Sequence, residues 1–181
     1  MTRFIKRICP VLGVLTLLGS AGCLGYRSGA NIPNNLRSIH VPAFENQTAY
    51  PMVGAVAAQQ FLDALIEDGT FRPGSYDQAR LRVQAIVESL DSKAVRYDRN
   101  HAIVPEEYRL TLTVKLYLFD RVSGETLING KRFSASDAVL TRGDFQTGTT
   151  DAIPRLAHTL AQRLVEAVIT AADSAALPPQ P

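Results

Sequence analysis

The sequence has few cysteines and no apolar run long enough to cross a membrane. Its only cysteines are Cys9 and Cys23. The longest apolar stretch, residues 8–18, has about eleven residues, against the roughly 20 that a transmembrane helix needs. These two shortages exclude a helical membrane protein and a small disulfide-rich scaffold. The fold must therefore depend on its own hydrophobic core.

Motifs of catalysis are also missing. The three histidines, at positions 40, 101 and 158, are far apart, and no His or Cys cluster has the spacing of a zinc site. No G-x-S-x-G elbow and no Gly-rich phosphate loop occurs. Glu106 and Glu107 would point to opposite sides of a strand, so they are unsuited to act as a paired acid and base. We predict no catalytic residue, no metal and no cofactor, and hence no enzyme.

The N-terminus, in contrast, carries a clear pattern. Residues 1–7 include three basic residues and no acid, the apolar stretch follows, and residues 19–22 are all small. This is the layout of a secretory signal peptide over residues 1–22. A cysteine directly after the small residues is similar to a bacterial lipobox, so we predict that Cys23 is lipidated and begins the mature chain. Ser20 departs from the usual Leu of that motif, and the alternative is an ordinary signal peptide cut near Ala21.

Cleavage before Cys23 changes what the composition implies. The formal net charge of +2 falls to about −1, because 16 of the 19 basic residues remain against 17 acidic ones. Net charge therefore gives no argument for a nucleic-acid partner, and we expect none. Cys9 is lost and an acylated Cys23 forms no disulfide. Leu24 stands where an Asp often signals inner-membrane retention, so we expect a lipid anchor on the periplasmic face of the outer membrane.

The remaining chain predicts a single α+β domain over residues 36–172. A lipidated N-terminus and tether at 23–35 precede it, and a disordered tail at 173–181 follows it. Apolar residues at spacings of three and four indicate helices at 52–68 and 151–171, the second capped by Thr150 or Asp151 with Pro154 in its first turn. Alternating apolar residues or turn signals indicate strands at 36–44, 80–90, 108–119 and 127–135.

This order of elements favours a two-layer sandwich. Two helices with one apolar stripe each can cover one face of a mostly antiparallel four-stranded sheet, in the order β-α-β-β-β-α. The alternation in residues 108–119 is the cleanest in the chain and leaves a mixed polar and aromatic row on the uncovered face. Residues 91–105 either extend two strands as a hairpin or form a loop.

Two sets of residues are candidate binding positions. The uncovered row is a candidate partner-facing surface, although Thr and Tyr are also simply good strand formers; its members are Arg109, Thr111, Thr113, Lys115 and Tyr117. A second set of basic residues clusters locally and would suit phosphate groups, although solvated charge explains it as well. These residues are Lys93, Arg96, Arg99, Lys131 and Arg132.

Several motifs together carry a family resemblance. "CLGYRSG", "IHVPAFENQT" and "EYRLTLTVKLYLFDRVSGE", with a helix after the second and another at the end, resemble the lipopolysaccharide-assembly lipoprotein (LptE) family. The resemblance implies a two-layer α/β sandwich that plugs and helps assemble the outer-membrane LPS-translocon β-barrel (LptD-like) and binds lipopolysaccharide. The basic residues above would be its LPS-binding positions. The alternative is another envelope system, as a peptidoglycan-synthase activator or a secretion-pore component.

Overall fold

The computed structural model describes residues 32–97, 105–140 and 145–176. They form one short 3-10 helix, two α-helices and six strands in mixed order. The elements are η2 (Asn34–Leu36), β1 (Ser38–His40), β2 (Glu45–Asn46), α2 (Val53–Asp68), β3 (Arg72–Pro73), β4 (Leu81–Tyr97), β5 (Pro105–Asp120), β6 (Thr126–Leu140) and α3 (Phe145–Ala176).

The sheet confirms the predicted α+β class and is more mixed than predicted. Its strand order is β3-β1-β4-β5-β6, with β2 also beside β4. The three long strands pair antiparallel, whereas the short β1, β2 and β3 make parallel pairs. The predicted first strand, 36–44, is one source of this difference. It ends as β1 at His40, before Pro42, which lacks a backbone N–H for the ladder, and the chain then returns to β4 as β2.

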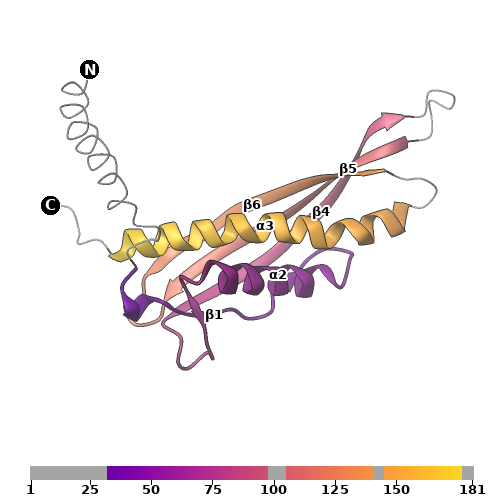
Figure 1. Cartoon of the computed structure of the whole chain (residues 1–181). Helices are drawn as coiled ribbons and strands as arrows, with labels where there is room; N and C mark the ends of the chain where they lie inside the picture. The colour runs from indigo at the N-terminus through magenta and orange to yellow at the C-terminus, as the bar shows by residue number, and fades with distance from the viewer. Residues whose placement is uncertain (1–31, 98–104, 141–144, 177–181) are drawn as a thin grey trace, which may run out of the picture.

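Both helices lie on one side of the sheet (Figure 1). Alternate residues from Leu81 to Val87 in β4 and from Leu110 to Leu118 in β5 point toward them and are buried, which is the period of two that the sequence shows. The apolar stripes of α2 and α3 complete a single core. Its largest buried side chains include Phe61, Leu65, Leu81, Leu110, Leu112, Leu116, Leu118, Leu156, Leu160 and Leu164.

Helix α2 ends as predicted, and α3 does not begin as predicted. Gly69 adopts φ 73° after α2, and its N–H donates to the Leu65 carbonyl at 3.2 Å. Helix α3 starts six residues before the predicted position, so Pro154 lies in its interior rather than in its first turn. Thr150 and Asp151, the predicted caps, therefore lie inside the helix, and the Thr150 hydroxyl donates to the Gln146 carbonyl of the preceding turn at 2.9 Å.

The segment left open as hairpin or loop is a hairpin as far as the structure describes it. Pairing of β4 with β5 continues to Tyr97 and Pro105. The two strands extend beyond the ends of β6 and α3 (Figure 1). This projecting tip lies at one end of the long molecule, and η2 lies at the other.

The described fold reaches past the predicted domain bounds at both ends. Ile32, which falls in the predicted tether, is only 2% exposed, and its carbonyl accepts a hydrogen bond from Nε of Arg37 at 3.0 Å. Helix α3 continues to Ala176, inside the predicted tail. The predicted signal peptide and Cys23 lie outside the described residues.

Candidate functional site

The sheet face opposite the helices is the main candidate surface, and we call it the open face. The structure brings the five predicted partner-facing residues together in one row of β5. They alternate with buried residues and are half-buried or exposed. Neighbouring strands supply polar partners, and the Thr111 and Ser136 hydroxyls lie 2.9 Å apart. This row therefore forms a continuous polar and aromatic surface.

Aromatic rings and one amine meet at the centre of the open face. The rings of Tyr117 and Phe119 stack with centroids 6.2 Å apart, and Nζ of Lys115 lies 5.5 Å from the Tyr117 ring. Gly130 of β6 packs against them with φ 63°. A Cβ at Gly130 would lie 2.8 Å from Cε of Lys115 and 3.1 Å from the Tyr117 hydroxyl. A strand glycine often marks such a close approach, so Gly130 is the signal in the sequence that could have located this contact.

An ion pair crosses the open face from β4 to β6. Nε and Nη2 of Arg132 donate to the two carboxylate oxygens of Glu88, at 2.6 and 3.1 Å. This hydrogen bonding lowers the pKa of Glu88 and raises that of Arg132, and the charge of nearby Lys115 also lowers the pKa of Glu88. Arg132 is therefore already paired with a carboxylate.

A second aromatic and basic group holds the loop that precedes β4. The ring of Tyr76 has two guanidinium groups near it, from Arg121 at 4.5 Å and Arg82 at 5.0 Å. Arg121 also donates to the carbonyls of Tyr76 and Ala79, and the His40 ring meets Tyr76 edge-on. Nε of Arg82 is buried with no hydrogen-bond partner among the described residues. This cluster fixes one end of the open face.

A buried ion pair closes the turn after β5. The carboxylate of Asp120 is 6% exposed and accepts hydrogen bonds from Arg80 at 2.8 and 3.1 Å. It also accepts the backbone N–H of Val122 at 2.9 Å. These donors, Arg80 first, lower the pKa of Asp120 to about 2 despite its burial. The pair ties the loop before β4 to the β5–β6 turn.

The four predicted LPS-binding residues that the structure describes do not form one patch. Lys93 lies opposite Arg109 on the β4–β5 hairpin, and Arg96 pairs there with Glu106 and Glu107 at 3.5 and 3.4 Å. Arg99 lies outside the described residues. Lys131 and Arg132 are neighbours in β6, so they point to opposite faces of the sheet: Arg132 lies on the open face, whereas Lys131 points toward α3.

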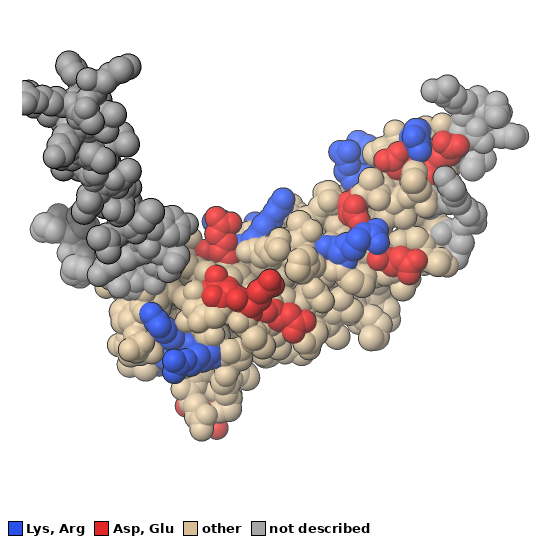
Figure 2. Space-filling view, in the orientation of Figure 1, with Lys and Arg blue, Asp and Glu red and all other residues tan. Residues whose placement is uncertain are grey.

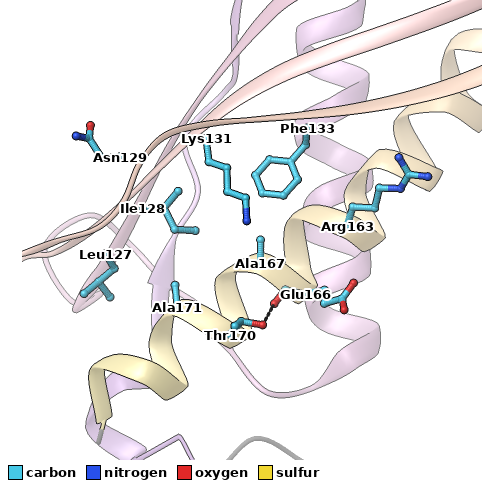
Figure 3. A pocket seen from close by; sticks show the side chains of 10 residues that line it. All are labelled: Leu127, Ile128, Asn129, Lys131, Phe133, Arg163, Glu166, Ala167, Thr170 and Ala171. Atoms are coloured by element: carbon cyan, nitrogen blue, oxygen red, sulfur yellow. Dashed lines mark hydrogen bonds between the residues drawn. The ribbon is translucent and has the colours of Figure 1, made fainter. Parts of the chain in front are cut away.

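Lys131 lines a groove between β6 and α3, which we call the β6–α3 groove. It has a volume of about 750 Å³, and the Lys131 side chain extends into it toward Ala167 (Figure 3). The Lys131 ammonium lies 5.3 Å from the ring of Phe133. The wall residues are Leu127, Ile128, Asn129, Lys131, Phe133, Arg163, Glu166, Ala167, Thr170 and Ala171.

Acidic side chains gather near the middle of the helix side of the molecule (Figure 2). Glu67 and Asp68 of α2 and Glu166 of α3 line a smaller hollow of about 420 Å³ between the two helices. Within residues 32–97, 105–140 and 145–176, no three His, Cys, Asp or Glu side chains are grouped as a metal site requires. No helix in these ranges is long and apolar enough to cross a membrane.

Solved structures of bacterial proteins, two of them named as lipoproteins, are similar to this fold. A candidate lipoprotein from Caulobacter crescentus CB15 is 20% identical, with a TM-score of 0.51 over 80% of this chain and 96% of its own. An uncharacterized lipoprotein B from Nitrosomonas europaea is 10% identical, with a TM-score of 0.51 over 83% and 92% of the two chains. A Xanthomonas campestris protein is 7% identical, with a TM-score of 0.53 over 76% and 85%. No curated protein matches the chain by sequence.

The fold is thus of a class that includes bacterial lipoproteins. The lipopolysaccharide-assembly model, LptE, matches residues 36–168, and this chain therefore belongs to the LptE family. The predicted resemblance is confirmed. The family consists of non-enzymatic lipoproteins of the bacterial envelope that take part in lipopolysaccharide assembly.

Proposed function

We propose that this chain is an outer-membrane lipoprotein, anchored by acylated Cys23, that plugs and helps assemble the LPS-translocon β-barrel. The family match over residues 36–168 is the observation that carries this proposal. In it, the domain sits in the lumen of the LptD-like barrel and binds lipopolysaccharide during export to the cell surface.

The open face supports a contact with a barrel wall. The lumen of a transmembrane barrel is polar, and a plug needs a rigid surface of polar side chains against it. The row from Arg109 to Tyr117 is such a surface, because it lies on a continuous three-stranded sheet and is held by cross-strand contacts. The aromatic rings at its centre add apolar area of the kind that interfaces use.

A pull-down of the lipidated protein from membranes tests the barrel contact. A β-barrel of the LPS-translocon type, recovered in equal amounts with the chain, is the expected result. Lys115→Glu reverses a charge at the centre of the open face and should reduce recovery, whereas Glu67→Lys on the helix side should reduce it less. Recovery of a peptidoglycan synthase, or of a ring of this chain alone, would contradict the proposal.

Lipopolysaccharide binding is tested by neutralising the five predicted basic residues in two groups. One variant replaces Lys93, Arg96 and Arg99 of the hairpin segment, and another replaces Lys131 and Arg132 of β6. Because Arg96 and Arg132 already pair with carboxylates, we expect them to contribute less to binding than Lys93 and Lys131. The combined variant should bind purified LPS more weakly than the parent. Unchanged binding of the combined variant would exclude these residues as the LPS contact.

A further inference from the structure

The β6–α3 groove has an apolar floor that the described residues leave open. Leu127, Phe133, Ala167 and Ala171 pack against the hydrophobic core and yet are only partly buried. An exposed apolar surface next to a core indicates a contact with another segment or molecule. The sequence of this chain offers a segment for that contact.

The chain enters the described fold at the end of the molecule where α3 finishes. Ile32 is 2% exposed and belongs to the same core as Ala172 of α3. In Figure 1 the first described residues, in indigo, lie at the same end of the molecule as the C-terminal end of α3. The α3 wall of the groove runs from Arg163 to Ala171 and stops one residue before the buried Ala172. The described fold therefore begins at the same end of the molecule as the end of α3 at which this wall stops.

The segment before Ile32 is long enough to follow the groove. Residues 24–31 can extend over roughly 26 Å at about 3.3 Å per residue. The stretch of α3 from Arg163 to Ala172 spans only about 14 Å at 1.5 Å per residue. We propose that residues 24–31, with the sequence LGYRSGAN, dock in the β6–α3 groove, with Tyr26 on its apolar floor and Arg27 beside Glu166.

The side chains of the groove suit these two residues. Tyr26 brings an aromatic body that packs on Phe133 and a ring face for the Lys131 ammonium, which already lies 5.3 Å from Phe133. The Thr170 hydroxyl donates at 2.8 Å to the backbone carbonyl of Glu166 and not to its carboxylate. The carboxylate has no hydrogen bond or ion pair to any residue that the structure describes. A guanidinium next to this carboxylate supplies the complementary charge.

Such docking shortens the connection between Cys23 and the domain. With residues 24–31 held on α3 and β6, the folded domain lies close to the lipid anchor instead of at the end of a free tether. The docking of residues 24–31 concerns the chain itself, whereas its effect on the distance to the anchor rests on the proposed acylation of Cys23.

A single tryptophan reports on the docked segment. The chain contains no Trp, so Tyr26→Trp in the full lipidated protein gives one fluorophore at the predicted contact. We expect emission shifted to the blue and several-fold slower quenching by acrylamide than for a solvated indole. Adding Ala167→Gln, which fills the groove, should return both to solvent values. Adding Ala175→Gln, at an exposed position of the same helix, should change neither.

Two fluorescence results would overturn the inference. Solvent-like emission of the Tyr26→Trp protein would show that the segment is not bound. Shielded emission that Ala167→Gln leaves unchanged would place residue 26 in lipid, in detergent or elsewhere on the protein.

Disulfide trapping gives a second test that does not depend on filling the groove. Tyr26→Cys combined with Ala167→Cys should form an intramolecular disulfide under mild oxidation, since an acylated Cys23 adds no free thiol. The same change combined with Ala175→Cys serves as the matched control. Equal trapping in the two pairs would contradict a specific docked position.

Discussion

Replacing Asp120 by Asn should destabilise the protein by an amount that depends on pH. The folded pKa of about 2, against 3.8 for the unfolded carboxyl, corresponds to about 2.5 kcal/mol of stability at neutral pH. Asn keeps an acceptor for the Val122 N–H and loses the charge that Arg80 binds. In urea denaturation followed by circular dichroism, we expect the midpoint to fall by about 1 M at pH 7.

The pH dependence of this stability loss separates the contribution of the Asp120 charge from that of the side chain's shape. Because the folded pKa lies below the unfolded one, the contribution of Asp120 is complete well above pH 4 and is lost as the pH falls through about 2. At pH 3 the difference between the parent and Asp120→Asn should shrink to about 1.3 kcal/mol by the same linkage. Asp137→Asn is the matched control, because its pair with Arg155 is more exposed and should contribute less than about 1 kcal/mol. An Asp120→Asn effect of equal size at pH 3 and pH 7 would refute the electrostatic explanation.

Three further predictions concern stability. In urea denaturation, Gly130→Ala should lower the free energy of unfolding more than Gly69→Ala does. Both glycines have positive φ, but only at Gly130 would the new Cβ meet other side chains. Equal losses of unfolding free energy would contradict the close approach at Gly130. Leu112→Ala removes a fully buried side chain between the layers and should cost about 2–5 kcal/mol, and a smaller loss would argue against a close-packed core. Glu88→Gln should leave the denaturation midpoint nearly unchanged at neutral pH, because its pair with Arg132 is exposed to water; a shift as large as that of Asp120→Asn would show a stronger pair.

Elements defined by a local period could be predicted from the sequence. The alternation of residues 108–119 and the helical stripes mark buried faces directly, so the two layers and the open row of β5 followed from the pattern alone. The start of α3 did not follow, because Gly and Thr residues after position 140 are typical of a loop. In the structure Gly148 lets the helix approach β6, where a Cβ would lie 2.8 Å from Cγ1 of Val139. A tertiary contact of that kind leaves no local periodic signal.

The candidate surfaces divide in the same way. The partner-facing row lies within one strand, so its common face was predictable. Which side chains the basic residues contact depends on the register between strands. Arg132 meets Glu88, 44 residues away, across a sheet in which β4 also changes register between Val87 and Ser89. No spacing in the sequence encodes that contact, and the predicted cluster is therefore divided: Arg96 and Arg132 pair with carboxylates, and Lys93 and Lys131 lie apart from each other.

The position of β6 at the end of the sheet bears on how the chain avoids aggregation. An outermost strand of 15 residues offers backbone groups that a second chain can pair with in an intermolecular sheet. Here the strand is interrupted by the left-handed Gly130 and carries adjacent cations at Lys131 and Arg132. A kinked and charged edge is a poor template for a neighbouring copy. We therefore expect the folded domain to remain monomeric at this edge instead of extending its sheet through a second copy.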